Sequence, residues 1–361
     1  MRGRPRQFGR VRTAAPSGAA RRIFLFLLAI TLTGALLSRA SGAPARLWVA
    51  DEWIGNFETG DFSQWSGIQR AETDRIRIVT DPVRDGRFAA RFDVQPGDYP
   101  AGRTGERAEL FVDTADRDGT ECYYAWSTLF PTDFVSDPVW KQMFVQWHGP
   151  GSSAASVSFQ VSGSRLVVRA GSPWTPTAWA QYDVGPLVLG SWQDFILHVR
   201  WGGAHSGFLE IWRNGKLVVP RHYHQNVAPG TGNYLKLGYY RDPSVHPTVI
   251  YEDGMRRASS LAGVISSFRL QFVSRPGLNR GVLSFEARSF AQAKVVVELR
   301  RAKSRRWLRV ATVAADGSGR LPVRLVVPRR LRGARSLRIR ALVDRGLDSS
   351  VRIAVASLRP H

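Results

Sequence analysis

The feature that most limits the fold of this chain is a succession of short β-type runs. From Trp53 onward, runs rich in β-branched and aromatic residues are separated by Gly, Pro, Asp and Asn, and no helical period is sustained. The clearest hairpin signal is Asn214-Gly215 between residues 208–212 and 216–219, because Asn-Gly takes the positive φ angles of a two-residue turn. Twelve Trp residues supply apolar faces that two stacked sheets can bury between them. We therefore predict an all-β fold.

Charge divides the chain into three segments. Residues 1–45 contain eight Arg and no Asp or Glu, residues 46–274 contain 22 Lys and Arg against 24 Asp and Glu, and residues 275–361 contain 21 against five. The net charge of +22 therefore arises at the two ends of the chain. The nearly neutral middle segment must be interpreted from its motifs rather than from the overall charge.

Residues 1–45 have the parts of a cleaved export signal: an Arg-rich start, an apolar run over residues 23–37, and small residues up to Ala45. Arg21-Arg22 before the apolar run also fits a twin-arginine signal, so the Sec and twin-arginine routes both stay open. About 15 apolar residues fall short of the ~20 that a membrane-spanning helix needs. We predict a secreted, extracellular protein that acts as a monomer.

Two domains follow the leader. We predict a concanavalin-like β-sandwich jelly roll in residues 46–270, and a smaller, immunoglobulin-like β-sandwich in the basic residues 271–361, where Asp316-Gly317 marks a turn between Arg-rich strands. The basic domain either holds an anionic glycan or the cell envelope, or is a solvated surface of a structural module. Nucleic acid is not an expected partner, since the chain has no recognition motif for it.

Three segments of the middle domain carry polar side chains two residues apart, which places them on one face of a strand. The segments are Arg107-Ala108-Glu109, Gln146-Trp147-His148 and Tyr234 to Tyr240. The intervening residues are apolar and would face the core of the sandwich. Side by side in one sheet, the three strands would offer Arg107, Gln146, His148, Lys236 and Tyr240 to one groove. That set of side chains suits an anionic sugar chain.

These residue types match the demands of β-elimination on a uronate. Loss of the C5 proton needs hydrogen-bond donors or cations that stabilise the charge developing on the carboxylate, which Gln and Arg can supply. It also needs a base near C5 and an acid at the C4 oxygen. His148, with a reference pKa near 6.5, and Tyr240, with one near 10, are candidates for those roles.

The middle domain resembles the jelly-roll polysaccharide lyases, a group with heparin-lyase-like, glucuronan-lyase-like and alginate-lyase-like members. The resemblance covers most of residues 55–257 and rests on the order and spacing of five motifs. These are FETGDFSQW (57–65), RAEL (107–110), QWHG (146–149), WRNGK (212–216) and YLKLGYYR (234–241). Alginate-lyase-like members usually have Asn-Gln after the last tyrosine and Ile or Val between Gln and His. Arg241-Asp242 and Trp147 stand there in this chain, which favours the heparin or glucuronan branch.

The resemblance implies a role for each matching residue. His148 and Tyr240 would transfer the protons, in an order that stays open, while Gln146 and Arg107 would neutralise the substrate carboxylate. We also predict that four further residues bind substrate, namely Lys236, Glu109, Tyr234 and Arg241. The alternative for Arg107 and Glu109 is a structural ion pair across strands, and both roles can hold at once. No metal or cofactor is required for this chemistry, although Glu58, Asp61 and Asp253 are candidate ligands of a structural Ca²⁺ ion.

Two other functions compete with the lyase. A hydrolase on the same fold needs two carboxylates around the scissile bond, and the chain has no Glu-x-Asp-x-x-Glu arrangement. A non-catalytic, lectin-like glycan-binding protein would have no need of His148 together with Tyr240. We expect Cys122, the single cysteine, to be a buried core residue, and the segment His222-Tyr223-His224 to have no role in the groove.

Overall fold

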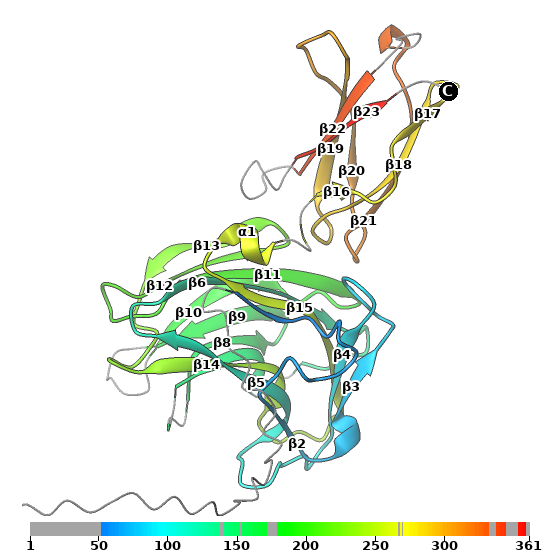
Figure 1. Ribbon diagram of the computed structural model, residues 1–361. Coiled ribbons are helices and arrows are strands. Elements are labelled where there is room, and N and C mark those ends of the chain that lie inside the picture. The colour runs from blue at the N-terminus through cyan, green and yellow to red at the C-terminus, as the bar shows by residue number, and fades with distance from the viewer. Residues whose placement is uncertain are drawn as a thin grey trace, which may run out of the picture. The chain divides into compact units, whose positions relative to one another are not determined.

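In the computed structural model, two large antiparallel sheets are stacked and two small sheets follow them (Figure 1). The structure describes residues 52–136, 141–149, 151, 154–171, 179–265, 268, 270–331, 337–343 and 353–358. The predicted export signal in residues 1–45 lies outside the described residues. Among the residues described, no helix is long and apolar enough to cross a membrane. The predicted all-β sandwich is confirmed.

Within the described residues, the first large sheet has eight strands in the order β13-β12-β11-β6-β15-β4-β3, with β1 paired to β15. Their bounds in chain order are β1 Glu52–Gly55, β3 Ile76–Val79, β4 Ala89–Val94, β6 Glu121–Phe130, β11 Ser191–Arg200, β12 Phe208–Arg213, β13 Lys216–Tyr223 and β15 Thr248–Ala258. A short 3-10 helix, η1 (Thr73–Arg75), precedes β3, and helix α1 (Leu261–Val264) follows β15.

The second large sheet has seven described strands in the order β10-β9-β8-β7-β14-β5-β2. Their bounds are β2 Gly67–Arg70, β5 Glu106–Arg117, β7 Gln142–His148, β8 Ala155–Ser162, β9 Arg165–Ala170, β10 Ala180–Pro186 and β14 Gly232–Arg241. The three segments with alternating polar residues are therefore adjacent strands, with β14 between β7 and β5. This adjacency is what the groove prediction required.

The strand pairs expected from turn residues are present. Asn214 and Gly215 have φ angles of 49° and 75°, and they join β12 to β13 as the two-residue turn that Asn-Gly favours. Strands β8 and β9 likewise pair across the turn that contains Gly163. Local turn chemistry thus sets the register of both hairpins.

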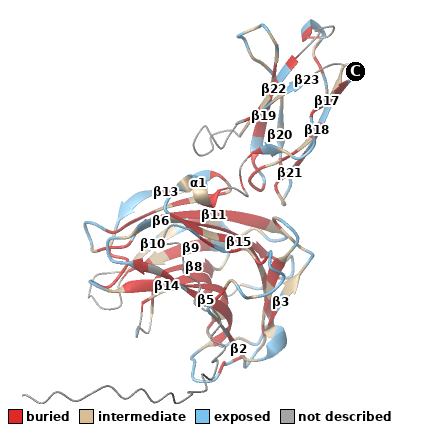
Figure 2. Ribbon diagram, in the orientation of Figure 1, coloured by how far each residue is buried: buried red, intermediate tan, exposed pale blue. Residues whose placement is uncertain are grey.

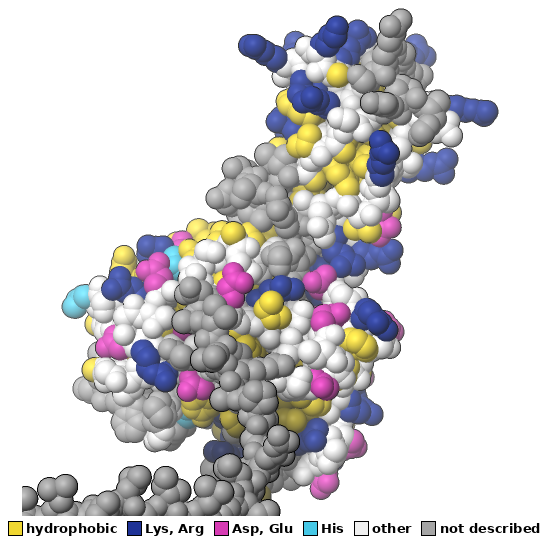
Figure 3. All heavy atoms as spheres, in the orientation of Figure 1, with side chains coloured by type: hydrophobic (Ala, Val, Ile, Leu, Met, Phe, Trp, Pro, Cys, Tyr) yellow, Lys and Arg dark blue, Asp and Glu magenta, His cyan; other side chains and the backbone are white. Residues whose placement is uncertain are grey.

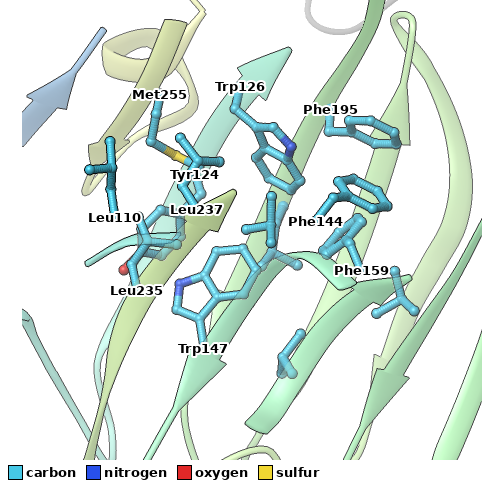
Figure 4. Close-up of a cluster of buried hydrophobic side chains, with 14 of the residues drawn as sticks. Leu110, Tyr124, Trp126, Phe144, Trp147, Phe159, Phe195, Leu235, Leu237 and Met255 are labelled. Atoms are coloured by element: carbon cyan, nitrogen blue, oxygen red, sulfur yellow. The ribbon is translucent and has the colours of Figure 1, made fainter. Parts of the chain in front are cut away.

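The core lies between the two large sheets and is built from alternate residues of the strands. Trp126 of one sheet meets Trp147 and Phe159 of the other at ring-centroid separations of 5.9 and 4.8 Å (Figure 4). All three rings are completely buried. Burial of one large apolar side chain contributes about 1.5–3 kcal/mol. Cys122 is buried in this core as predicted, and burial raises the pKa of its thiol well above the usual range.

The chain that follows α1 covers part of the outer face of the eight-stranded sheet. Strand β11 is therefore buried on both faces (Figure 2). Ile196 packs in one apolar cluster with Phe268 and Phe290 from the chain that follows α1. Asp194, two residues earlier on β11, is fully buried and pairs with Arg84. The polar residues that alternate along this strand therefore do not face solvent.

Arg84 and Asp194 also join the sandwich to the chain beyond residue 270. Arg84 Nε and Nη2 donate to the Asp194 carboxylate, both at 2.9 Å. Arg84 Nη2 also donates to Ser289 O at 2.8 Å, and Ala291 N donates to Asp194 Oδ2 at 2.7 Å. The buried ion pair of the sandwich thus bonds to the backbone of two residues beyond residue 270.

The small sheets contain the basic C-terminal segment. In the described residues, one consists of β16 Gln271–Phe272, β17 Gly277–Asn279, β18 Val282–Arg288 and β21 Arg320–Val326. The other has the order β20-β19-β22-β23, with bounds β19 Lys294–Arg301, β20 Leu308–Ala314, β22 Leu337–Val343 and β23 Ile353–Leu358. A 3-10 helix, η2 (Arg329–Leu331), lies between β21 and β22. The domain boundary at residue 270 stays a prediction.

Candidate active site

A groove of about 530 Å³ lies on the seven-stranded sheet. Its described lining includes five cationic side chains and no Asp or Glu; the cations are Arg103, Arg107, Lys141, Arg169 and Lys236. Gln146, His148, Tyr234 and Tyr240 also line it, so six of the eight predicted site residues are in the groove. The positive lining gives the groove an affinity for anions.

Strand alternation explains why these side chains reach the groove. Ala108, Trp147, Leu235 and Leu237 have no exposed surface and fill the core. Their neighbours on β5, β7 and β14 therefore point to the opposite face of the sheet. The same sheet that buries the core thus displays the polar set.

Glu109 lies beside the groove residues without lining the groove. Its Oε2 accepts from Arg107 Nη1 at 3.1 Å and lies 3.6 Å from Lys236 Nζ, while its Oε1 accepts from Gln146 Nε2. The predicted ion pair between Arg107 and Glu109 is therefore formed, but within β5 rather than across strands. A single buried carboxylate thus contacts three groups of the groove, whereas we predicted that Glu109 binds substrate.

Lys236 lines the groove from β14, the strand between β5 and β7. Its Nζ donates to Gln69 Oε1 at 3.2 Å, and its side chain is almost fully buried. Burial lowers the pKa of Lys236, an effect that the neighbouring Glu109 opposes. Lys236 thus supplies a desolvated positive charge, which acts more strongly on a bound anion than a solvated one does.

His148 is held by its own backbone neighbour. Its Nδ1 lies 2.9 Å from Gly149 O, and because a carbonyl only accepts, Nδ1 carries the proton and Nε2 keeps a lone pair in the neutral ring. Burial lowers the pKa of His148, and the positive charges of Lys236 and Arg107 lower it further. The ring is therefore neutral at pH 7 and can accept a proton.

The register places the two tyrosines of β14 at different points of the groove. Tyr234 pairs with His148 across the strands, and their ring centroids are 5.5 Å apart. Tyr240 pairs with Arg107, whose Cζ lies 4.2 Å from the Tyr240 ring centroid. Six residues of strand separate the tyrosines, which is roughly 20 Å along the backbone. Tyr234 is thus the neighbour of His148, and Tyr240 is the neighbour of Arg107.

Arg241 is not part of the groove. Its side chain lies on the other face of β14, where Nε donates to Glu106 Oε2 at 2.8 Å and Nη1 donates to Thr248 Oγ1 at 2.6 Å. Its residue surface is only 2% exposed. The structure therefore gives Arg241 a structural ion pair in place of the predicted contact with substrate.

The candidate Ca²⁺ ligands are separately bonded. Glu58 Oε1 accepts from the backbone of Arg87 and Phe88, both at 3.0 Å, and Asp61 Oδ1 accepts from Ser63 N at 3.0 Å. Burial raises the pKa of Asp253 well above its usual range. No three His, Cys, Asp or Glu side chains gather as a metal site in the part of the chain that is described. These carboxylates do not form the predicted cluster.

Sequence reasoning missed several lining residues. Ser158 and Gln160 on β8 have the same two-residue spacing as the motifs, which could have identified them. Arg169 on β9 alternates with buried Val168 and lies 5.3 Å from the ring centroid of Trp179. The segment His222-Tyr223-His224 is not among the described residues that line the groove.

Comparison with solved structures finds chains of similar structure at low sequence identity. An endo-β-1,4-glucuronan lyase from the fungus Trichoderma reesei is 16% identical, with a TM-score of 0.49 over 59% of this chain and 96% of that one. The alginate lyase vAL-1 from Chlorella virus is 12% identical, with a TM-score of 0.40 over 56% and 96%. The catalytic domain of a glycoside hydrolase family 131 protein from Coprinopsis cinerea is 14% identical, with a TM-score of 0.41 over 58% and 94%.

Sequence comparison adds the family. No curated protein sequence matches this chain. The family model described as polysaccharide lyase matches residues 57–256, which is more than half of the 361 residues and includes the whole β5, β7 and β14 groove floor. The chain therefore belongs to the polysaccharide lyase family.

Proposed function

We propose that this chain cleaves a uronic-acid-containing polysaccharide by β-elimination and leaves an unsaturated uronate end. The observation that carries the proposal is the composition of the groove, in which five cations, His148 and two tyrosines line one surface. A polymer with a carboxylate on each uronate is the substrate class that complements this charge. The family establishes a polysaccharide lyase, and the groove charge supports the uronate.

Arg107 and Gln146 hold the substrate carboxylate in this proposal. Arg107 is nearly buried, and in the described part of the chain its Nε–H has no hydrogen-bond partner. Gln146 gives one N–H to Glu109 and keeps a second for substrate. Donors fixed in this way stabilise the charge that develops on the carboxylate as the C5 proton leaves.

His148 and a tyrosine of β14 carry the protons. Neutral His148 takes the C5 proton on Nε2, the electron pair of the C5–H bond forms the C4–C5 double bond, and the C4–O bond breaks. The tyrosine hydroxyl gives its proton to the departing oxygen. Tyr240 is the acid that the family resemblance implies, and Tyr234 is the second candidate, favoured by the register because it lies opposite His148.

The test is incubation of the full chain with polyglucuronate, alginate, heparin and hyaluronan. Ultraviolet absorbance from the C4–C5 double bond should rise with at least one of them. New reducing ends without that absorbance would show hydrolysis, and binding of every polymer without cleavage would show a lectin. Either result would overturn the proposal.

Three tyrosine variants assign the acid. Tyr240→Phe removes only the hydroxyl and should reduce kcat by about 10²- to 10⁴-fold, the usual contribution of a positioned proton donor, with binding retained. Tyr223→Phe is the matched control, since Tyr223 is exposed on β13 and does not line the groove. Loss of kcat in Tyr234→Phe with full activity in Tyr240→Phe would move the acid to Tyr234.

We also propose that residues 1–45 direct export, that residues 271–361 form a separate domain, and that the protein is an extracellular monomer. The Arg-rich start, the apolar run and the small residues up to Ala45 support export. Expression with the leader and N-terminal sequencing of the protein in the medium would test it. A mature protein that begins near residue 46 is the expected result.

A further inference from the structure

The outer face of the sheet β20-β19-β22-β23 is strongly basic. Buried Leu299 and Ile339 point into the small sandwich, so Arg300, Arg338 and Arg340 on the same two strands point outward. Arg300 pairs with Arg338 across the strands, and exposed Arg309 stands on the neighbouring β20. Adjacent strands thus place like charges together, which is unfavourable unless an anion lies over them.

Trp307 lies among these arginines. Its ring centroid is 4.9 Å from Arg300 Cζ and 4.5 Å from Arg340 Cζ, so two guanidinium groups stack on one indole. Glu298, which Arg340 Nε contacts at 2.5 Å, is the single acid on this face among the residues described. In the part of the chain that the structure describes, no ion pair joins the other arginines of this face to a carboxylate.

The adjoining turn extends the basic surface. Residues 301–306 connect β19 to Trp307 and contain four exposed cations, which are Arg301, Lys303, Arg305 and Arg306. Arg301 Nη2 donates to Arg330 O at 2.9 Å, and this bond brings exposed Arg329 and Arg330 of η2 beside the turn. We call the surface formed by Arg300–Trp307, Arg309, Arg329, Arg330, Arg338 and Arg340 the Trp307 patch. Figure 3 shows Lys and Arg side chains over these C-terminal strands, with few acidic ones on the face in view.

We propose that the Trp307 patch is a second binding site for the anionic polysaccharide, separate from the groove. This inference rests on the proposed uronate substrate. Guanidinium groups match carboxylates with paired N–H donors, and the Trp307 indole positions two of them, those of Arg300 and Arg340, by stacking. A polymer held at the patch raises the local concentration of its other segments around the same molecule. The patch therefore acts on long chains and leaves short oligosaccharides unaffected.

The experiment compares two triple variants of the full chain. Arg305→Ser, Arg306→Ser and Arg338→Ser remove three exposed cations of the patch. The control variant, Arg275→Ser, Arg280→Ser and Arg324→Ser, removes three exposed cations from the other small sheet or its turns. Thermal unfolding checks that both variants fold. Each is measured for binding to long polyglucuronate and for cleavage of a uronate tetrasaccharide.

The patch variant should bind the polymer about tenfold more weakly, and the control variant less than about twofold, with tetrasaccharide cleavage unchanged in both. Equal losses in the two variants would show that only net charge matters and would overturn the proposal. Tighter patch-dependent binding of duplex DNA than of polyglucuronate would assign the surface to nucleic acid and would also overturn it. If the patch variant loses polymer binding but no variant cleaves the polymer, the patch proposal would be supported. Only the proposed lyase activity on this substrate would then be refuted.

Discussion

Glu109 Oε2 accepts a hydrogen bond from Arg107 Nη1 at 3.1 Å, and the two residues lie two positions apart on the same face of β5. The carboxylate also approaches Lys236 and accepts from Gln146. Arg107 and Lys236 are both nearly buried, which makes their positive charges costly to desolvate. The negative charge of Glu109 offsets that cost. Glu109 is therefore a positioning residue for the groups proposed to hold the substrate carboxylate.

Glu109→Gln tests this positioning. The amide keeps the shape of the carboxylate but loses its negative charge. Its N–H groups would also face those of Gln146, which now donates to Glu109 Oε1. We expect kcat/KM to fall about 100-fold, the cost of a small displacement of reacting groups. Glu109 raises the pKa of His148 and Lys236, so the variant should also move the acidic limb of the pH profile to lower pH. Glu72→Gln, at an exposed site, is the control, and unchanged kcat/KM in Glu109→Gln would contradict the role.

The pH dependence of kcat/KM should report His148. As the base it must be neutral, so activity is lost as pH falls through its pKa and is complete above it. Burial lowers that pKa, which places the acidic limb below the usual value of about 6.5. Lys236→Met removes a charge that lowers the pKa of His148, so the limb should shift upward, opposite to Glu109→Gln. A limb that persists unchanged in His148→Gln would assign it to another group.

Gly105 fixes the place of the Tyr240 ring. A Cβ at Gly105 would collide with Tyr240 Cε2 and would lie 2.9 Å from Arg241 O, so Gly105→Ala must displace the ring. We expect a large loss of kcat although the Tyr240 hydroxyl remains. Gly97→Ala is the matched control. The φ angle is positive at both glycines, 86° at Gly97 and 72° at Gly105, but a Cβ added at Gly97 would meet open space. Equal kcat in the two variants would show that the position of Tyr240 does not matter.

The alternation of polar and apolar residues was sufficient to predict the groove floor. A period of two along residues 234–240 separates Leu235 and Leu237, which enter the core, from Lys236 and Tyr240, which enter the groove. The same alternation places Arg241 on the core side, and there it pairs with Glu106, although we predicted that it binds substrate. Local periodicity was the better guide to the position of this residue.

Other parts of the site depend on contacts that no local pattern records. Arg103 and Lys141 reach the groove from loops, and Arg169 reaches it because β9 lies two strands from β7 in the sheet. The separation of His148 from Tyr240 follows from the register of β7 on β14, since a one-step change of register alters every cross-strand neighbour. Pairing across the sheet is a tertiary property. The sequence pattern therefore predicted which residues lie in the groove but not which residues lie next to each other.

The ion pair of Arg84 with Asp194 joins residues 110 positions apart, and it predicts a large stability effect. Asp194→Asn would leave the fully buried Arg84 guanidinium without its countercharge and weaken the bond from Ala291 N, so the free energy of unfolding should fall by about 3–5 kcal/mol. Asp183→Asn is the matched control, because Asp183 also receives two bonds from one arginine, Arg165, but on the exposed surface. There water replaces the partner and the expected loss is at most about 1 kcal/mol. Urea unfolding of both variants measures the difference, and equal midpoints would contradict a stabilising role for the buried pair.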